Sequence, residues 1–386
     1  MHSGLPPGGA DGLLRRCLCG LLSVPAADHH VTGDSSMAGP AWQLNCPVSI
    51  SAQSDCVTLA HGEGGRLMRR LLDQVIHPGL GISPRFADAA QLQVDGNRLA
   101  FSTDSYVVSP LFFPGGDIGT LAVYGTCNDL AVSGAVPRWL SLSLILEEGL
   151  PIPVLLKVLQ SIALAAAECR IQIVTGDTKV VPHGDADGMF LNTTGIGELV
   201  DPVPAGPEAL QPGDALIVSG PIGRHGIAIL AAREQLDFIP APATDGASLI
   251  PAIQALRAAI GPEVRAMRDA TRGGVTAVLH EWAIASGKTL YLDEKRIPVD
   301  AATQSACELL GLEPMHLACE GTMVLAVASA FAEQAVALLR NVSVSKDAAI
   351  IGTVQHRAVT PVIIRRMLGR EQSLDEPTGT PLPRIC

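Results

Sequence analysis

Hydrophobic and polar positions along the chain follow two periods, one typical of strands and one typical of helices. Four leucines at every second position from Leu140 to Leu146 predict a half-buried strand. The apolar stretch that follows, from Val154 to about Cys169, has the length and spacing of a helix. Further strands are predicted over residues 99–105, 171–175, 189–197, 215–219, 322–327 and 350–354, and further helices over 66–76, 118–130, 275–283 and 331–339. Strands and helices mix in both halves, which predicts an α/β (α+β) protein.

Composition divides the chain into four predicted segments: 1–50, 51–200, 201–368 and 369–386. The first is rich in Gly and Pro and is predicted to be a disordered or mis-started extension, with Met37 as an alternative start to Met1. Four prolines between residues 201 and 213 mark the expected boundary between an N-terminal and a C-terminal α/β domain. The last segment is polar and turn-rich without an apolar period, so it is predicted to be a flexible tail and not a packed element.

Composition and charge narrow the class of protein. The 386 residues are 47% hydrophobic and 17% charged, which is enough apolar material for the cores of two domains. The net charge of -11 and the lack of a basic cluster interleaved with aromatic residues argue against nucleic acid as a partner. Nine cysteines without a CxxC pair are typical of a reducing compartment and predict a cytoplasmic protein. The most apolar helical stretch, Val154 to Ala167, is interrupted by Lys157 and Gln160, so we expect no membrane span.

The last residue, Cys386, carries a thiol at the end of a Pro-rich segment. No following chain can bury this thiol, so it is a candidate substrate. On a tether of roughly eighteen residues it can reach a cleft in its own protein at an effective concentration of about millimolar. A frayed terminus that happens to end in Cys explains the same residues equally well.

The sharpest local signal is a predicted strand that breaks at Gly176 and continues with Asp177, Thr178 and Lys179. Asp177 is suited to hold Mg²⁺ and Lys179 to face a phosphate as a point charge. The segment lacks the spacing of a Walker A loop. A plain turn with a surface ion pair between Asp177 and Lys179 remains the alternative.

Glycines open a predicted helix near the start of the folded part. Gly62, Gly64 and Gly65 precede this helix and offer free N–H groups to a phosphate. Taken alone the signal is weak, because such loops are often only turns.

Polar residues also occur at the end of a strand and within an apolar helix. Asp104 ends a predicted strand, which is a common place for a carboxylate that binds metal. Asn128 and Asp129 are polar residues on an otherwise apolar helix, and a solvated helix edge is the alternative explanation.

Asp269 and Thr271 precede the predicted helix that begins at Val275. Helix capping is one explanation for both residues, and ligand binding is the other. Glu281 lies about two turns further along the helix, where a carboxylate transfers a proton or has no role.

Taken together, seven motifs resemble the HypE family of hydrogenase maturation proteins, the carbamoyl dehydratases. They are Leu59-Ala-His-Gly-Glu-Gly-Gly-Arg66, Thr103-Asp-Ser105, Phe112-Phe-Pro-Gly-Gly-Asp117, Gly125-Thr-Cys-Asn-Asp-Leu-Ala131, Gly176-Asp-Thr-Lys-Val-Val181, Arg268-Asp-Ala-Thr-Arg-Gly-Gly274 and Pro383-Arg-Ile-Cys386. Each motif alone is unspecific, but the combination is specific, and the resemblance extends from about residue 57 to residue 386.

The resemblance implies a fold and a reaction. The fold is similar to that of the aminoimidazole ribonucleotide synthetase (PurM-like) superfamily: two α/β domains, with ATP binding and homodimer formation through residues 51–200. The implied reaction is the ATP-dependent dehydration of an S-carbamoyl group on Cys386 to an S-cyanate. The implied partners are the carbamoyltransferase HypF, which modifies Cys386, and a HypC–HypD scaffold complex, which receives cyanide for the iron of [NiFe] hydrogenase.

The resemblance also implies roles for particular residues. ATP and Mg²⁺ are the expected cofactors, and the residues expected to bind them are Gly62, Gly64, Gly65, Asp104, Asn128, Asp177, Asp269 and Thr271. The expected metal ligands among them are Asp104, Asp177 and Asp269. Cys386 is the expected attachment point, Lys179 steadies the developing charge, and Glu281 accepts a proton from the carbamoyl nitrogen. His183 is a second candidate base.

Two positions depart from the family pattern. Arg224 stands where an acid is common before His-Gly, and Cys319 stands where Asn is common before Glu-Gly. Two other functions fit the same motifs. One is an ATP-dependent synthetase or kinase that acts on a free small molecule, and the other is a nucleotide-responsive scaffold without turnover.

Overall fold

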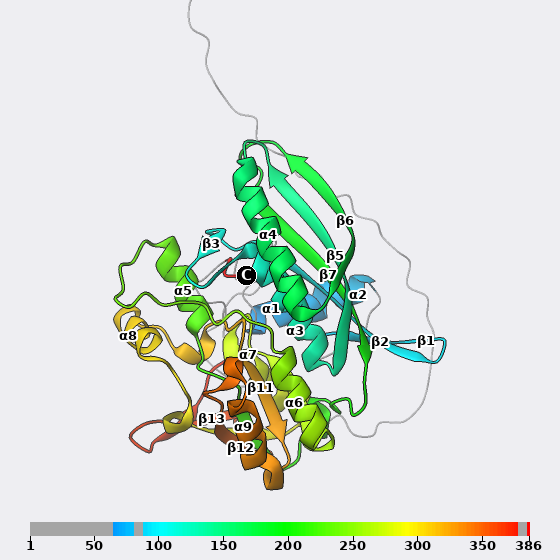
Figure 1. The fold of residues 1–386 in the computed structure, drawn as a ribbon. Coiled ribbons are helices and arrows are strands. Elements are labelled where there is room, and N and C mark those ends of the chain that lie inside the picture. Colours follow the sequence, from blue (N-terminus) through cyan, green and yellow to red (C-terminus); the bar gives the residue numbers. More distant parts are fainter. Residues whose placement is uncertain (1–64, 81–87, 377–383) are drawn as a thin grey trace, which may run out of the picture. The chain divides into compact units, whose positions relative to one another are not determined.

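The structure is a computed structural model that describes residues 65–80, 88–376 and 384–386. The predicted extension, residues 1–50, and the loop residues Gly62 and Gly64 lie outside the described residues. The described residues fall within one compact unit that contains two large β-sheets with helices packed against them (Figure 1).

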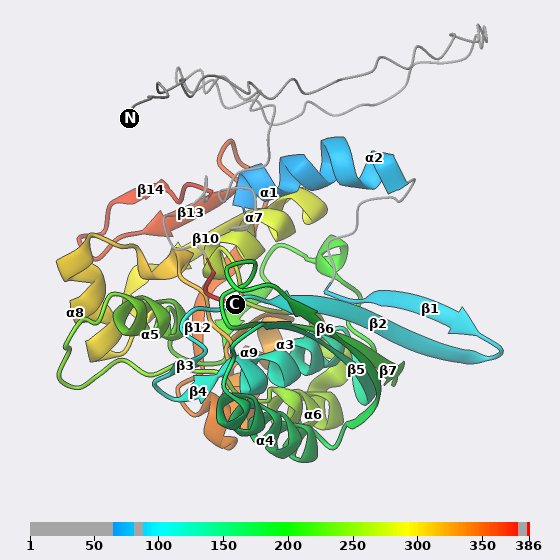
Figure 2. The ribbon, with the colours of Figure 1, turned by 90° about the horizontal axis from the view of Figure 1, so that it is seen from above.

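The first sheet has five strands in the order β1-β2-β7-β5-β6. They are β1 (Ala90–Val94), β2 (Asn97–Tyr106), β5 (Ala135–Glu147), β6 (Gln172–Val181) and β7 (Met189–Leu199). β5 and β6 are parallel because α4 (Ile152–Cys169) joins them as a crossover. α4 and α3 (Ile118–Val132) lie together on one face of this sheet, and the β1–β2 hairpin projects beyond it (Figure 2).

α3 begins at a complete N-cap. After the short hairpin of β3 (Phe112–Phe113) and β4 (Gly116–Asp117), the Asp117 carboxylate accepts from the N–H groups of Gly119 (2.8 Å) and Thr120 (3.0 Å). The Thr120 hydroxyl in turn accepts from the Asp117 N–H, which completes a capping box. α3 is buried on nearly every side, because its other faces pack on β9 (Val264–Asp269) and α6 (Ile250–Ile260) of the second half.

The second sheet has seven strands in the order β14-β13-β10-β12-β8-β11-β9. They are β8 (Ala215–Val218), β9 (Val264–Asp269), β10 (Thr289–Asp293), β11 (Met323–Val327), β12 (Ala349–Gln355), β13 (Val362–Arg365) and β14 (Glu371–Ser373). The helices of this half are α5 (Arg224–Arg233), α6 (Ile250–Ile260), α7 (Gly274–Ser286), α8 (Ala301–Leu310) and α9 (Ala332–Arg340).

The central strands of the second sheet are buried on both faces. Along β11, Val324 and Ala326 contribute to the core that contains Trp282 of α7, whereas Met323 and Leu325 contribute to the core of α6 and α9. Such alternation lets one apolar strand serve two hydrophobic layers.

The remaining elements are short. Ahead of the first sheet lie α1 (Gly65–Leu71), the π-helix η2 (Leu72–Ile76) and α2 (His77–Leu80). Single 3₁₀ turns are η3 (Pro207–Ala209), η4 (Gly261–Glu263), η5 (Glu294–Arg296), η6 (Pro314–His316), η7 (Ser329–Phe331) and η8 (Ser343–Ser345).

The strand over the four leucines and the helix after it are confirmed as β5 and α4, but the predicted turn at Gly176 is wrong. β6 continues without a break through Asp177 and Lys179 to Val181. A Cβ on Gly176 would lie 2.1 Å from the carbonyl oxygen of Leu142 on β5. The glycine therefore permits a close approach of two strands, and no turn is needed.

The expectation that nothing packs after Gly369 is also wrong for part of that segment. β14 pairs with the edge of β13, and Glu376 forms an ion pair with Arg69. Leu374 is buried in the core that contains Trp282. A three-residue edge strand needs backbone partners more than an apolar period, so the sequence pattern did not reveal it. Residues 377–383 lie outside the described residues.

One helix in the described part of the chain, α4, is long and apolar enough by length and composition alone to cross a membrane. Its inner face packs on the first sheet through Val158 and Ile162, while Leu156 and Leu164 on its other face are exposed. A single helix of this kind is weak evidence for a span, because helices of soluble cores pass the same test.

Candidate active site

Three carboxylates from separate parts of the chain meet where the two sheets come together. Asp88 precedes β1, Asp129 lies on α3 and Asp269 is the last residue of β9. One carboxylate oxygen from each lies within 4.8 Å of the other two. This set of oxygen ligands suits a hard dication such as Mg²⁺.

The electrostatics of this acidic cluster favour a bound cation. Burial raises the pKa of Asp88 to about 6, and it raises the pKa values of Asp129 and Asp269 well above their usual range. Asp104 adds repulsion to all three. Arg268 offsets part of it, because its Nε lies 2.6 Å from the Asp88 carboxylate. Buried like charges of this kind need protons or a cation to neutralise them.

Of the three expected metal ligands, Asp269 belongs to this cluster, Asp104 lies close enough to repel its members, and Asp177 lies apart from it. Asp104 faces α3, where the Thr126 hydroxyl donates to its carboxylate over 3.2 Å, and Asp269 is a cluster member. Asp177 lies on β6, three strand spacings from β2, or about 14 Å away. Its carboxylate is 2.8 Å from Lys179 Nζ, and both side chains are exposed. In this chain the pair is the surface ion pair that the sequence left open.

Asp88 and Asp129 were not predicted from the sequence as site residues. Asp88 stands alone after the predicted first helix, in no recognisable motif. Asp129 was visible as an acid on an apolar helix, which was the available signal. The solvated-edge explanation for Asp129 is wrong, because its carboxylate accepts from the Ser102 hydroxyl at 2.6 Å inside the cluster.

Asn128 is completely buried and is likewise not on a solvated edge. Its amide donates to the carbonyls of Ala247 (3.0 Å) and Glu320 (3.3 Å) and accepts from the Leu249 N–H (2.8 Å). These bonds connect α3 to two loops of the second half. The structure thus gives Asn128 a structural role, and its expected contact with the nucleotide stays a prediction.

The capping explanation for the residues before α7 is wrong. The N-cap of α7 is Gly273, and no side chain caps it. Asp269 belongs to the acidic cluster instead, while Thr271 lies in the connecting loop. Gly274 has a φ of +58°, and a Cβ there would lie 2.5 Å from the Leu317 carbonyl oxygen, so this loop requires glycine.

Glu281 lies on α7, where Arg268 binds its carboxylate in a close ion pair. The same guanidinium bridges to Asp88, so Glu281 borders the cluster and is already engaged. Its expected role as a base stays a prediction.

Glu320 is a buried acid that the sequence analysis named only as the neighbour of Cys319. Burial raises its pKa well above the usual range, and Asp269, Asp245 and Asp104 raise it further, while Arg272 lowers it. Its backbone N–H is bound by Asp245 at 3.1 Å, which fixes this segment against the loop before α6.

The chain terminus lies at the same place. The N–H of Val107, just after β2, donates to a carboxylate oxygen of Cys386 over 3.0 Å. The pKa of Arg272 is raised chiefly by the charge at Cys386. Burial of Arg272 lowers its pKa, and the charges of Asp104 and Glu320 raise it further. The terminal residue, a cation and buried acids therefore share one site.

Comparisons with known proteins identify the family to which this fold belongs. Two family models match: the N-terminal domain of AIR synthase related proteins over residues 86–199 and their C-terminal domain over residues 211–364. The chain is 48% identical over 337 residues to carbamoyl dehydratase HypE of Escherichia coli K12, which covers 86% of this chain and 99% of that protein.

Solved structures of similar proteins include a HypE–HypF complex and HypE bound to ATP. The first has a TM-score of 0.75 and 40% identity, and it covers 80% of this chain and 99% of that chain. The second has a TM-score of 0.72 and 42% identity, and it covers 86% and 100%. The chain therefore has the two-domain α/β fold of AIR synthase related proteins.

The acidic cluster predicts a pH dependence for the metal-free protein. The folded protein holds the Asp88 proton more tightly than the unfolded chain, so stability is lost as pH rises from about 4 to about 6. In Asp88→Asn the free energy of unfolding should not show this loss, which is about 3 kcal/mol at most in the wild-type protein. Urea unfolding in EDTA across this range measures it.

Asp177→Asn is the matched control, because Asp177 is exposed and Lys179 lowers its pKa. This variant should keep the wild-type profile. If Asp88→Asn loses stability over this pH range as the wild-type protein does, the pKa of Asp88 is not the cause of the loss.

Proposed function

The chain belongs to the HypE family of carbamoyl dehydratases, and from that premise we propose that it dehydrates a carbamoyl group carried on its own Cys386. The reaction class is an ATP-dependent dehydration in hydrogenase maturation. The observation that supports the choice of Cys386 is the position of the terminus, which is bound at Val107 and interacts with Arg272, whose charge also faces Asp104 and Glu320.

The reaction converts S–C(=O)–NH₂ into S–C≡N. The carbamoyl oxygen leaves with a phosphoryl group, and the nitrogen loses two protons. When bound, Mg²⁺ and ATP supply the phosphoryl group and the positive charge that make this oxygen a leaving group. Arg272, which already faces the charge at Cys386, orients the carbamoyl group.

Asp88, Asp129 and Asp269 would hold Mg²⁺, with Asp104 beside them. The support is that their oxygens converge and that their pKa values are raised by burial and mutual repulsion. A dication removes the cost of these charges, and Mg²⁺ prefers carboxylate ligands together with phosphate.

Glu320 is our choice for the base that accepts a nitrogen proton, in preference to the expected Glu281. Its raised pKa makes its carboxylate a stronger base, and Arg272 connects it to the terminus through shared charge. Glu281 is engaged by Arg268.

The proposed partners follow from the family. HypF would place the carbamoyl group on Cys386, and a HypC–HypD scaffold complex would receive the cyanide for the hydrogenase iron. The expected setting is cytoplasmic, with neither nucleic acid nor membrane as a partner. A HypE relative has been solved in complex with HypF, which supports the first partner.

The central prediction concerns the mass of the terminal peptide. Incubation with ATP, Mg²⁺, carbamoyl phosphate and the transferase should first add a carbamoyl group to Cys386 and then remove the mass of one water. Intact-mass spectrometry of the C-terminal peptide checks both steps. In Cys386→Ala both mass changes should vanish, because the attachment atom is gone.

The same experiment separates the alternatives. ATP hydrolysis that Cys386→Ala leaves unchanged would favour a synthetase or kinase acting on a free molecule. ATP binding without any hydrolysis would favour a scaffold.

A second prediction compares the two acids. Glu320→Gln should lower the single-turnover dehydration rate about 10²–10⁴-fold, the usual contribution of a general base. Glu281→Gln should lower it about tenfold at most, because Arg268 keeps Asp88 as a partner. The reverse order of effects would return the role to Glu281. Binding of labelled ATP should stay unchanged in Glu320→Gln.

We also propose a homodimer through the edge of the first sheet. β6 is an edge strand whose apolar side chains Ile173, Val174 and Val180 are 40%, 58% and 67% exposed. A groove of about 680 Å³ runs over β5 and β6 beside them. Unpaired apolar edges are typical of interfaces. Asp177 and Lys179 would then serve the nucleotide site of the second copy.

The proposed dimer predicts that a charged substitution on β6 lowers the molar mass of the protein in solution. Val180→Asp should shift the protein from dimer to monomer in light scattering, because a charge at this edge is costly to bury. Leu309→Asp on α8, an equally exposed apolar position at 74%, is the matched control and should leave the mass unchanged. A wild-type monomer at all concentrations would refute the interface.

A further inference from the structure

The last three residues of the chain lie in a slot between the segment 107–109 and helix α5, which we call the terminal slot. The Val107 N–H donates to the Cys386 carboxylate (3.0 Å), and the Ser109 N–H donates to the Arg384 carbonyl (3.4 Å). The terminus therefore lies against the chain that leaves β2, in the manner of an added strand.

Two side chains of α5 bind the remaining backbone groups. His225 Nε2 is 2.6 Å from the Ile385 carbonyl oxygen. Arg233 donates through Nη2 to the Arg384 carbonyl (2.6 Å) and through Nε to the Ser109 carbonyl (3.0 Å). Each of the last three residues thus has a backbone oxygen that accepts a hydrogen bond in the slot.

The neighbours of His225 fix its orientation and tautomer. A carbonyl oxygen only accepts, so Nε2 carries the proton and Nδ1 accepts from the Thr244 hydroxyl at 2.8 Å. The Thr244 oxygen accepts from the Gly246 N–H (3.0 Å), and the Phe113 ring packs edge-on against the imidazole. Thr244 and Phe113 lie outside the tail, so their contacts orient the Nε2 donor of His225 independently of the tail.

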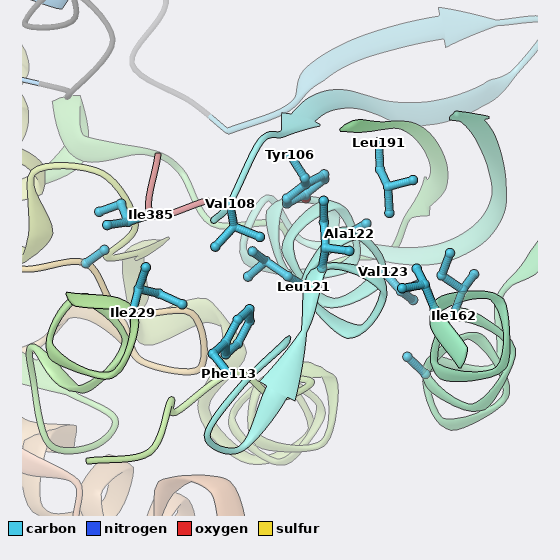
Figure 3. Close-up of a cluster of buried hydrophobic side chains, with 14 of the residues drawn as sticks. Tyr106, Val108, Phe113, Leu121, Ala122, Val123, Ile162, Leu191, Ile229 and Ile385 are labelled. Atoms are coloured by element: carbon cyan, nitrogen blue, oxygen red, sulfur yellow. The ribbon is translucent and has the colours of Figure 1, made fainter. Parts of the chain in front are cut away.

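Among the three terminal residues, the side chain of Ile385 is the buried one. It belongs to the hydrophobic core between α3, α4 and the first sheet, which also contains Ile229 of α5, Val108 and Phe113 (Figure 3). Arg384 is half-buried and holds a left-handed φ of +59°. Its guanidinium contacts the Val107 carbonyl (2.9 Å) and Asp187 (2.9 Å). Recognition thus depends on one aliphatic side chain, one arginine and the backbone.

We propose that the terminal slot is a peptide-binding site for a free α-carboxylate preceded by an aliphatic residue and an arginine, and that it binds such a peptide in trans. The hydrogen bonds in the slot are made by residues 384–386 themselves, so a free peptide that ends in the same three residues can form them, and covalent attachment raises the local concentration of the tail. The use of the slot in dehydration rests on the proposed function, whereas binding does not.

The carboxylate is the most distinctive part of this recognition. The Val107 N–H makes a charge-assisted hydrogen bond to it, and Arg272 interacts electrostatically with the same residue, Cys386. A C-terminal amide presents no negative charge and a donor instead of a second acceptor. The amide should therefore bind about tenfold more weakly than the acid.

The experiment uses the full chain with Ile385→Asp, because this change empties the slot of its own tail by placing a charge in the apolar core. The probe is the fluorescein-labelled peptide Pro-Leu-Pro-Arg-Ile-Ser, in which Ser replaces the reactive thiol, and anisotropy reports binding. The acid should bind at least tenfold more tightly than the amide and than the peptide with Asp in place of Ile. Wild-type chain should bind the probe more weakly than Ile385→Asp, because its own tail competes.

Protein variants then identify the slot. Adding His225→Leu to Ile385→Asp should abolish binding, while His225→Gln, which retains a donor near the Nε2 position, should keep part of it. The peptide comparisons require no change in the slot, so they decide the matter even where a histidine variant fails to fold.

Equal binding of the acid and the amide, or no binding of the acid up to solubility, would overturn the proposal. Dehydration of the carbamoyl group on Cys386 in the wild-type chain is measured separately by mass spectrometry. Acid-selective binding without dehydration would refute the proposed function and leave the slot intact. Dehydration without acid-selective binding would do the reverse.

Discussion

The site depends on an excess of buried negative charge at the junction of two sheets. Asp88, Asp129 and Asp269 converge there with Asp104 nearby, and Arg268 supplies one positive charge that it shares with Glu281. Burial and repulsion push the pKa values of the three converging acids upward, so the ionised cluster is unstable by itself. The hydrophobic cores of the two sheets hold these groups in place. A site built in this way is prepared for a cation with a polyanion attached, since the cation neutralises the acids and the polyanion neutralises the cation.

α3 is the element that makes this convergence possible. It carries Asp129 into the cluster, and the neighbouring Asn128 uses its amide to bind the backbone of two loops from the second half. One of those loops contains Glu320, so the proposed metal ligand on α3, Asp129, and the proposed base are positioned by adjacent residues. Any shift of α3 would move both groups together. This coupling gives a physical reason why a helix buried on nearly every side carries two polar residues in succession.

The sequence predicted those parts of the molecule whose signal is local. The alternating leucines of β5 and the apolar period of α4 were correct because burial has the same period as the pattern. Asp104 and Asp269 were singled out because Asp104 follows a strand-like alternation, Asp269 precedes a glycine-opened helix, and both lie in motifs of the resemblance. Asp88 and Glu320 were missed because their roles arise only when distant segments meet. Gly176 was misread because a glycine serves a turn and a close strand approach equally well, and only the carbonyl of Leu142 distinguishes them. β14 was missed for a related reason, because the edge of β13 with which it pairs exists only in the folded protein.

In the proposed reaction the terminal residue has two tasks that oppose each other, since it must leave its site to be modified and return to react. β14 and the Arg69–Glu376 ion pair anchor the chain at Glu376, so the thiol can extend at most about 35 Å from that point, compared with about 60 Å from Gly369. The short tether keeps the effective concentration of the tail near millimolar. A slot that binds the free tripeptide with a Kd of about 1 mM would then be half occupied, and both tasks remain accessible. Recognition by a few hydrogen bonds and one isoleucine is on this scale, whereas a larger apolar tail would stay bound.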